Sequence, residues 1–333
     1  MLDEVRTSCA AVMTRARWVE IDHARVAAYA AAFTANERQG PHDIAIHEAT
    51  TPLVQRPLSS DETSTGVDAA TEATVALVVA LDAINFGSGY HPVVRKRPGC
   101  SGAVTMATAL RAWAGRTGPV TPDRLQQLTP RDTHEIFGQP SDDGPVAELM
   151  DLFATALNDL GRLVAAYGSF TAFVAAADRS ADRLVHQLDQ LAFYRDRALH
   201  DGHEVLFYKR AQITVADLDR ELRGTGPGAF DDLDQLTAFA DNLVPHVLRV
   251  DGVLRVDPDL VARIDREELL AAGSEEEVEI RAAGVHAVEL LRAALRTEGH
   301  DVRSSRLDEV LWRRGGGPRY KAVARHRCRT VFY

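Results

Sequence analysis

The sequence predicts a mainly α-helical globular fold with a few short β-strands. Hydrophobic residues make up 45% of the 333-residue chain, which is ample for a packed core. Apolar residues recur mostly at helical spacing, and alanine, leucine, arginine and glutamate are abundant. Aromatic residues contribute only 6%, and stretches with strand character are few and short.

The chain is expected to form one compact unit with an insertion. The first 48 residues predict an N-terminal helical segment. Residues 49–68 are polar and lack periodicity, so we expect an exposed, disordered insertion there. The main core follows over residues 69–333. Proline, glycine, serine and aspartate cluster near residues 140–145, which is where a sub-domain boundary is expected.

Three stretches of the core have clear helical periodicity. Two of them are residues 146–163 and 180–191. The third is an apolar stripe over residues 278–291, which follows the capping-box pattern Ser274-x-x-Glu277. The expected strands and loops are short: strands at 203–208, 253–256 and 329–333, and glycine-rich loops at 224–228 and 315–318.

A further apolar stripe places a carboxylate beside a proline. The stripe consists of Leu233, Leu236, Ala240, Val244 and Val247. It predicts a helix with Asp241 on its shoulder, facing a cleft lined by core residues. Pro245 has no N–H to bond the carbonyl of Asp241, so a kink is expected in this helix. A carboxylate at a kink is a good site candidate; the alternative is a solvated aspartate beside a structural kink.

Charge and cysteine content exclude several classes of protein. A net charge of −10 argues against a general nucleic-acid surface, although a small anion pocket remains compatible with it. Three scattered cysteines indicate neither a disulfide framework nor a zinc site. The N-terminus has no secretory pattern, and the longest apolar stretch, residues 75–81, is too short to span a bilayer. We therefore expect a soluble, cytoplasmic protein without membrane contact.

Cofactor motifs are also missing from the sequence. It contains no phosphate loop, no Rossmann glycine fingerprint and no nucleophile elbow. His134 and Glu135 begin like a metalloprotease motif, but no second histidine follows at the required spacing. We expect neither a metal nor a cofactor, and hydrolysis by acid–base and electrostatic means is the simplest chemistry for such a chain.

Six blocks of sequence, in order, resemble the queuosine salvage family of queuosine 5′-phosphate N-glycosidases. Two of them carry the runs Phe-Tyr-Lys-Arg-Ala-Gln, starting at Phe207, and Phe-Ala-Asp, starting at Phe239, with Pro245 four residues after the aspartate. The six blocks are residues 81–86, 207–218, 239–245, 277–281, 307–312 and 326–333. Together they make the resemblance fairly specific over roughly residues 70–333.

The resemblance implies an activity and an architecture. The implied reaction is hydrolysis of queuosine 5′-phosphate to queuine and ribose 5-phosphate, by a monomer that acts on this small molecule and not on nucleic acid. The implied architecture is similar to that of helical DNA glycosylases. Cleavage of a C1′–N bond develops positive charge on the ribose, which a carboxylate can stabilise or attack.

The resemblance also implies roles for residues on two of the blocks. Asp241 is expected to be the catalytic carboxylate, and Phe239 to stack on the base unless it only packs in the core. Asp308 is expected to accept hydrogen bonds from the guanine-like edge of the base. Glu309 stands where the family often has an aromatic residue, so its contact with the cationic arm of queuine is a weaker expectation, and Arg313 is expected on the surface.

Three further residues are candidates for binding the substrate. Lys209 is expected either to contact the phosphate or to pair with a catalytic carboxylate, the alternative being a structural ion pair with Asp217 or another core acid. His47 resembles a family histidine that reaches the base, with His42 as a competitor. Asn85 is expected to shape the mouth of the pocket with Phe86, although a helix-ending role is equally compatible. His326, Arg327 and Arg329 are expected either near the pocket or in packing of the terminus.

Two other functions remain open from the sequence. A phosphatase acting on the same nucleotide needs a cluster of metal-binding carboxylates, which the sequence does not show. A carrier protein for queuosine-type nucleosides needs the base contacts but not Asp241.

Overall fold

The computed structural model describes residues 1–33, 37, 68–141 and 144–333. This part of the chain is mainly helical, and its strands form three short pairs. The pairs β1–β4 and β2–β3 are antiparallel, and β5–β6 is parallel. The predicted mainly α-helical fold class is confirmed. Among the described helices, none has the length and apolar character of a membrane span.

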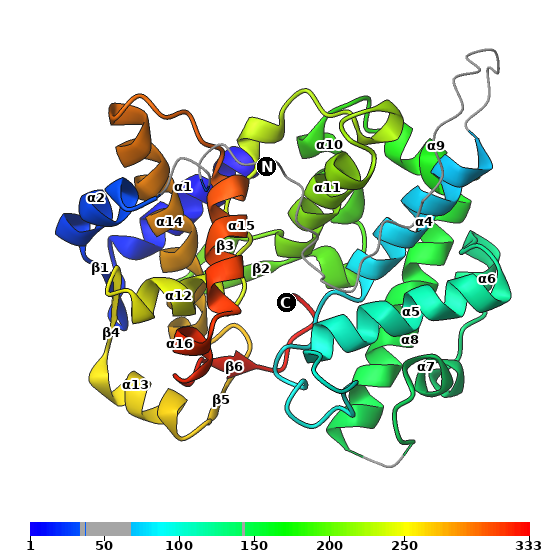
Figure 1. The fold of residues 1–333 in the computed structure, drawn as a ribbon, viewed down its shortest axis with the longest axis horizontal. Coiled ribbons are helices and arrows are strands. Elements are labelled where there is room, and N and C mark those ends of the chain that lie inside the picture. The colour runs from blue at the N-terminus through cyan, green and yellow to red at the C-terminus, as the bar shows by residue number, and fades with distance from the viewer. Residues whose placement is uncertain (34–36, 38–67, 142–143) are drawn as a thin grey trace.

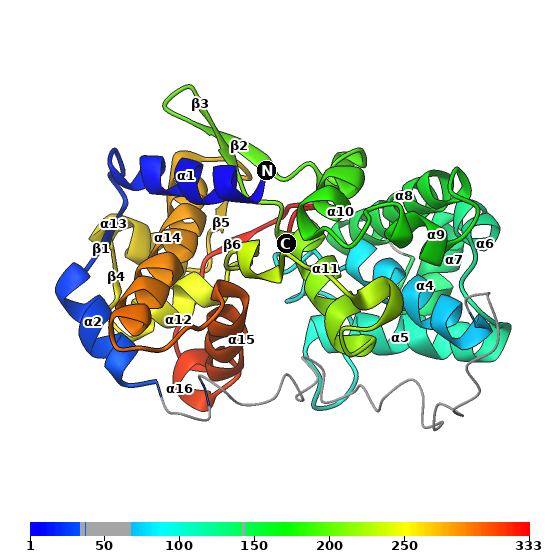
Figure 2. The same cartoon turned by 90° about the horizontal axis from the view of Figure 1, so that it is seen from above.

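The molecule has two halves, each with its own hydrophobic cluster (Figures 1 and 2). The first half contains the cyan and green helices of Figure 1. Its elements are α4 (Ala69–Ala83), α5 (Gly102–Thr117), α6 (Pro122–Gln126), α7 (Pro130–Phe137), α8 (Pro145–Ala165), α9 (Phe170–Ala175), α10 (Ala181–Leu188), α11 (Lys209–Glu221), and the 3-10 turns η1 (Ala192–Tyr194), η2 (Gly226–Gly228) and η3 (Leu233–Gln235).

The second half combines the N-terminal region with the C-terminal third of the chain. Its long central helix is α14, against which α2, α12 and α15 pack. Its elements are β1 (Val19–Ile21), α2 (His23–Ala31), α12 (Val244–Val250), β4 (Leu254–Val256), α13 (Pro258–Asp265), β5 (Leu269–Leu270), α14 (Glu275–Thr297), α15 (Ser304–Gly315), α16 (Pro318–Lys321) and β6 (Arg327–Cys328).

Helix α1 (Leu2–Met13) and the hairpin β2–β3 (Arg197–His200 and His203–Leu206) connect the halves. Helix α1 packs on α14 and on β3, while its buried face, including Val5 and Cys9, belongs to the cluster of the first half. The two halves share α1, the C-terminal segment and the segment before α12. These three parts of the chain form the junction between the halves.

Several helices begin as the sequence indicates. Pro145 occupies the first turn of α8, where its missing N–H leaves no intrahelical bond unmade. Ser180 caps α10, and Ser274 accepts a hydrogen bond from the Glu277 N–H at 3.4 Å at the start of α14. The reciprocal half of the predicted capping box is wrong, because the Glu277 carboxylate accepts from the Gly273 N–H at 3.2 Å.

Two predictions about secondary structure are wrong. The stripe over residues 233–247 is buried, but only its end is α-helical, because α12 begins at Val244 with Pro245 in its first turn and the stripe starts in the 3-10 turn η3. A proline costs little there, so no kinked helix passes through Asp241. The final strand is β6 at Arg327–Cys328, and residues 329–333 are irregular.

The domain divisions proposed from the sequence stay predictions. Residues 1–33 contain α1, β1 and α2, and Asp68 caps α4 by accepting from the Thr71 N–H. Residues 49–67 of the predicted insertion lie outside the described part of the chain. Helices from both sides of residues 140–145 contribute to the same hydrophobic cluster.

Candidate active site

The site is built around an irregular segment, residues 236–243, which lies where the two hydrophobic clusters meet. Leu236 and Ala240 pack into the first cluster, while Ala238 and Val244 pack into the second. Phe239 is buried, yet it is part of neither cluster as far as the described residues go. The segment therefore runs between two cores and holds Asp241 and Phe239 at their junction.

Buried side chains from elsewhere in the chain supply the hydrogen bonds that this irregular segment lacks. Gln212 of α11 accepts from the Thr237 N–H at 2.8 Å and donates to the Thr237 hydroxyl at 2.9 Å. The Arg281 Nε of α14 donates to the Ala240 carbonyl at 3.0 Å. Because a buried backbone group without a partner is costly, these bonds allow a non-helical segment to stay in the interior.

The Asp241 carboxylate is fixed through one of its two oxygens. Its Oδ1 accepts hydrogen bonds from the backbone N–H groups of Leu243 at 2.8 Å and Val244 at 3.0 Å. These donors lie at the start of α12 and have no partner inside the helix. The other oxygen accepts no hydrogen bond from a described residue, and the side chain is partly accessible. Asp241 therefore has a fixed orientation and an oxygen left for a ligand.

Asp308 lies beside this segment on α15, and it is almost completely buried, with 4% exposure. Its Oδ1 accepts from the Phe239 N–H at 2.8 Å. Burial, reinforced by the nearby Asp241 charge, raises the pKa of Asp308 well above its usual range. A ligand that brings N–H donors to this carboxyl group would offset that cost.

Lys209 is the cation next to these carboxylates. Tyr208, with φ of +49°, turns the chain from the hairpin into α11, and the Lys209 N–H donates to Asp196 Oδ2 at 3.1 Å. The ammonium group donates to the Asn85 carbonyl at 3.4 Å. Burial lowers the pKa of Lys209, and the charges of Asp241, Asp82 and Asp308 oppose this shift. The alternative ion pair with Asp217 does not form, since Asp217 pairs with Arg220 at 2.8 Å.

The end of α4 forms another side of the site. Asn85 follows the helix and is partly buried, and its carbonyl is the acceptor for Lys209. Phe86 packs edge-on against Phe153, with ring centroids 5.1 Å apart, and the Arg210 guanidinium lies over its ring at 4.8 Å. Arg210 thus helps to hold the end of α4, whereas Asn85 is near the carboxylates.

The remaining candidates either form ion pairs and packing contacts or lie outside the described residues. The Glu309 carboxylate pairs with Arg306 and Arg313 on its own helix. His47, like its competitor His42, lies outside the described residues. Arg327 pairs with Glu267 at 3.1 Å, and Arg329 lies over the Tyr90 ring at 5.3 Å, so both take part in packing around the C-terminal segment.

Sequence reasoning missed two basic side chains, namely Arg325, which lies near Asp241, and His91, which lies near Arg325. Burial lowers the pKa of Arg325, and the charge of Asp241 opposes this shift. Burial, with the charges of Arg325, Lys96 and Lys209, lowers the pKa of His91 to about 4. Arg325 stands one residue before the C-terminal block of the sequence and His91 shortly after the first block, which is the only sequence signal that pointed to them.

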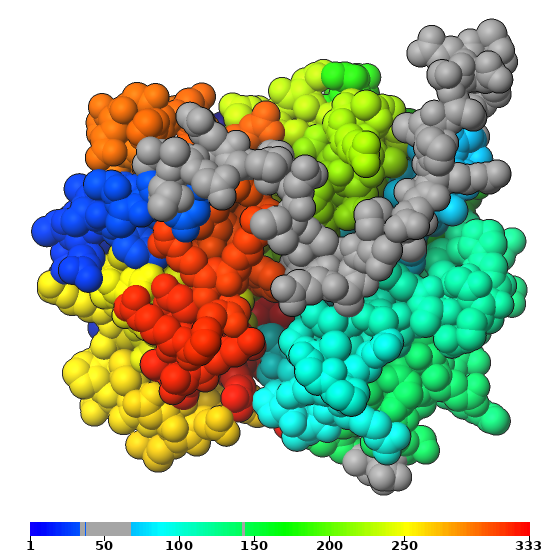
Figure 3. Space-filling view, in the orientation of Figure 1, coloured from blue at the N-terminus to red at the C-terminus, as the bar shows by residue number. Residues whose placement is uncertain are grey.

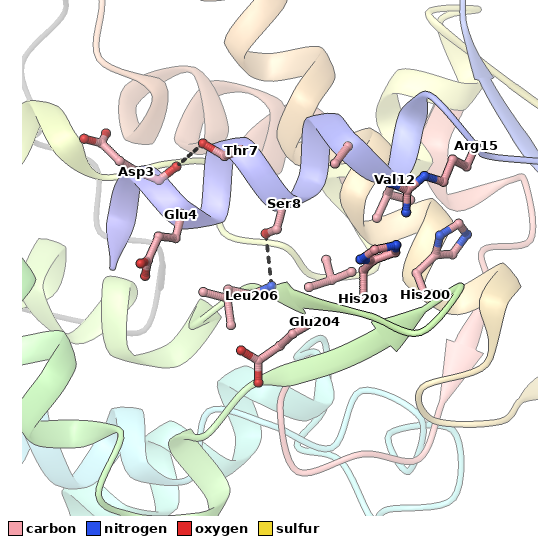
Figure 4. A pocket seen from close by; sticks show the side chains of 12 residues that line it. Asp3, Glu4, Thr7, Ser8, Val12, Arg15, His200, His203, Glu204 and Leu206 are labelled. Carbon is pink, nitrogen blue, oxygen red and sulfur yellow. Dashed lines mark hydrogen bonds between the residues drawn. The ribbon is translucent and has the colours of Figure 1, made fainter.

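An open cleft of ≈ 450 Å³ lies elsewhere, between α1 and the β2–β3 hairpin (Figure 4). Arg15, His200 and His203 line one end, and Asp3, Glu4 and Glu204 line the other. None of the described site candidates lines this cleft. Among the described residues, no group of three or more histidine, cysteine or acidic side chains is arranged to hold a metal ion.

The chain is similar to one protein family and to several individual proteins. The sequence model of the queuosine salvage protein family matches residues 65–333. A protein of Sphaerobacter thermophilus named queuosine 5′-phosphate N-glycosylase/hydrolase is 37% identical over 338 residues, which cover 99% of this chain and 97% of that protein. Proteins of the same name from Dictyostelium discoideum and Mus musculus are 36% and 34% identical, covering 63% and 58% of this chain and 65% and 61% of their own lengths.

Proposed function

Because the chain belongs to the queuosine salvage protein family, we propose that it is an N-glycosidase that hydrolyses queuosine 5′-phosphate to queuine and ribose 5-phosphate. The observation that carries the proposal is Asp241, held by two backbone N–H groups at the junction of the two cores, with Asp308 and Lys209 beside it. The released queuine is then available for salvage into tRNA.

Asp241 acts on the ribose. As the C1′–N bond breaks, positive charge develops on C1′ and the ring oxygen, and the free oxygen of Asp241 stabilises it. The N–H groups of Leu243 and Val244 hold the other oxygen, so the carboxylate does not have to reorient during the reaction. Water provides the hydroxyl group that remains on C1′ and the proton that neutralises the departing base.

Asp308 and Phe239 hold the base. A guanine-like edge presents N–H groups, and the buried Asp308 carboxyl group accepts hydrogen bonds from them. Phe239 is buried without belonging to either hydrophobic cluster of the described residues, as suits a ring that stacks on a ligand. The hydrogen bond between the Phe239 N–H and Asp308 fixes the ring and the acceptor relative to each other.

The remaining contacts belong to the same proposal. Asn85 and Lys209 set the edge of the pocket at the end of α4, and Lys209 balances the carboxylate charges. Glu309 and His47 complete the contacts with the base. The enzyme is a cytoplasmic monomer that needs no metal or cofactor, and the net charge of −10 supports a free nucleotide over nucleic acid as the substrate.

Mass spectrometry of the purified protein with queuosine 5′-phosphate, queuosine and GMP, in the presence of a chelator, tests the proposal. We expect queuine and ribose 5-phosphate from the first compound and no guanine from GMP. Release of inorganic phosphate with the glycosidic bond intact would indicate a phosphatase. Binding of queuosine 5′-phosphate without turnover would indicate a carrier, and either result would overturn the proposal.

A further inference from the structure

Arg325 lies near Asp241 and His91 lies near Arg325, and neither has a role in the chemistry described so far. Neither side chain donates a hydrogen bond to a described residue, and neither forms an ion pair there. Both are partly buried. A guanidinium group carries five N–H donors, so leaving it partly desolvated without an acceptor is costly. Such a cost is typical of a group that receives its partner from a ligand.

The three segments that carry Asp241, His91 and Arg325 meet at Asn242. The Asn242 amide, adjacent to Asp241, donates to the Ser88 hydroxyl at 3.1 Å and to the His326 carbonyl at 3.3 Å. It thereby connects the loop that carries His91 with the segment that carries Arg325. Figures 1 and 2 show this loop and the red C-terminal segment running together between the two halves.

Close packing makes this junction rigid. The Gly87 N–H donates to the Tyr333 carbonyl at 3.0 Å, and a Cβ atom at Gly89 would lie 2.3 Å from the Cys328 carbonyl oxygen. A Cβ atom at Gly102, in the first turn of α5, would lie 2.5 Å from the His91 ring. His91 is therefore held against the amino end of a 16-residue helix, which adds positive potential.

The charges of the site divide into two parts. Lys209 is near three carboxylates, Asp241, Asp82 and Asp308, and its charge serves to balance them. The only described acid that affects the pKa of Arg325 is Asp241, and the charged groups that affect His91 are all cations. Figure 3 shows a hollow between the red C-terminal residues and the cyan residues, at the border where these two segments meet.

We propose that Arg325 and His91 bind the 5′-phosphate of the substrate, while Lys209 serves the carboxylates. The 5′-phosphate of a nucleotide is separated from C1′ by the ribose. The side chains that bind the phosphate must therefore lie beside the catalytic carboxylate, at the far end of the ribose from C1′. Arg325 offers the planar fork that suits a phosphate group. His91, neutral when the site is empty, becomes an effective cation once a dianion neutralises the three positive charges around it. The inference rests on the proposed glycosidase function.

The test compares two substrates in variants of the full-length protein. For Arg325→Met and His91→Gln, we expect kcat/KM on queuosine 5′-phosphate to fall by about 10–100-fold, as for loss of a hydrogen bond to a charged group. The same variants should hydrolyse queuosine, which lacks the phosphate, within about 3-fold of the unaltered protein. Equal losses on both substrates would overturn the proposal, because they would mean that Arg325 acts through Asp241.

Two further variants act as controls. Arg327→Met removes a neighbouring arginine that pairs with Glu267 outside the site, and it should leave kcat/KM unchanged on both substrates. Arg325→Lys keeps the charge and should restore part of the activity on the nucleotide if Arg325→Met folds poorly.

A binding experiment separates failure of the phosphate site from failure of the proposed function. Ribose 5-phosphate binding, measured by calorimetry, does not depend on turnover. We expect it to weaken by the same 10–100-fold in Arg325→Met. If the unaltered protein hydrolyses neither nucleotide nor nucleoside, the glycosidase function fails, but ribose 5-phosphate binding that depends on Arg325 still supports the site. Binding that is unchanged in Arg325→Met would overturn it.

Discussion

Two clusters of buried charges lie close together in this protein, and they differ in how their charges are satisfied. In the paired cluster, Arg281 donates to Asp196 at 2.7 Å and lies 3.7 Å from Glu277, and its guanidinium stacks on the rings of Phe207 and Tyr333. In the open cluster, Lys209 is near Asp241 and Asp308, Arg325 is near Asp241, and neither cation forms an ion pair with any described acid. Both clusters contain almost completely buried charges, such as Arg281 and Asp308, so burial alone does not distinguish structure from function.

The difference lies in ion pairing. A buried charge is tolerated when an opposite charge pairs with it, as Arg281 pairs with Asp196 and Glu277, and is otherwise costly. In the open cluster the pKa of Asp308 is raised and that of Lys209 is lowered, mainly by burial. Burial also raises the pKa of Glu277 in the paired cluster, but there the charge of its ion-pair partner Arg281 opposes the shift. A ligand that brings N–H donors to Asp308 and a phosphate group to Arg325 would supply the partners that the open cluster lacks.

The paired cluster also positions the open one. Asp196 accepts from the Lys209 N–H as well as from Arg281, and Arg281 holds the Ala240 carbonyl next to Asp241. The comparison thus predicts that substitutions in the open cluster mainly reduce activity and that substitutions in the paired cluster mainly reduce stability.

Replacement of Asp241 by Asn should give the largest effect. The amide keeps the volume and the oxygen acceptor for the Leu243 and Val244 N–H groups but loses the negative charge. We expect kcat on queuosine 5′-phosphate to fall by about 10³-fold or more, with substrate binding largely retained. Asp231→Asn, at an exposed ion pair with Arg179, is the control and should change nothing measurable. Unchanged turnover in Asp241→Asn would remove this residue from the mechanism.

Replacement of Arg281 by Met should destabilise the fold instead. Asp196 and Glu277 would remain buried without their cation, so we expect the free energy of unfolding to fall by about 3–5 kcal/mol. Lys209→Met is the matched variant in the open cluster, and it should lose activity with a much smaller change in stability. Denaturant titrations of the two variants measure the difference, and equal losses would contradict the division into two clusters.

The sequence predicted the regular parts of this arrangement better than the irregular ones. Helices α8, α10 and α14 follow from local periodicity and capping residues. The segment around Asp241 was expected to be helical because its apolar spacing reflects real burial. Its backbone is instead satisfied by Gln212, Arg281 and Asp308, which are 25 to 69 positions away along the chain.

The dependence on contacts between distant parts of the chain also explains which candidate site residues the sequence could indicate. Asp241, Asp308 and Lys209 lie on blocks that the resemblance identified, and the structure brings them together. Arg325 and His91 lie just outside those blocks, 234 positions apart by their numbers, 325 minus 91. Their proximity depends on the hydrogen bonds of Asn242 to two distant segments, which no spacing in the sequence expresses.

Replacement of Asp308 by Asn should have a moderate effect on the base contact. The amide oxygen can still accept from the Phe239 N–H, so the fold is retained. The amide NH₂ group replaces an acceptor with a donor opposite the N–H edge of the base, and we expect KM to rise by about 10–100-fold. Steady-state kinetics on queuosine 5′-phosphate measure this change. A large fall in kcat with an unaltered KM would instead assign Asp308 to the chemical step.

His326 lies near Arg325 of the open cluster and Arg281 of the paired cluster, and its replacement gives the smallest expected effect at neutral pH. Burial, then the charges of Arg325, His246, Arg249 and Arg281, lower its pKa to about 3. The unfolded chain therefore binds a proton at this position near pH 6.5, and the folded protein does not until about pH 3. Since the unfolded state holds more protons in this window, stability falls as the pH is lowered, by about 1.4 kcal/mol for each pH unit.

A glutamine at position 326 cannot take up that proton, so His326→Gln should flatten the dependence of stability on pH. We expect the variant to gain on the unaltered protein progressively from pH 6.5 towards pH 4, measured by denaturant titration at several pH values. His186→Gln, at an exposed histidine, is the control and should leave the curve unchanged. Parallel curves for His326→Gln and the unaltered protein would mean that His326 is already charged in the folded state. The positive charges of Arg325 and Arg281 would then have to be neutralised more fully than their described contacts indicate.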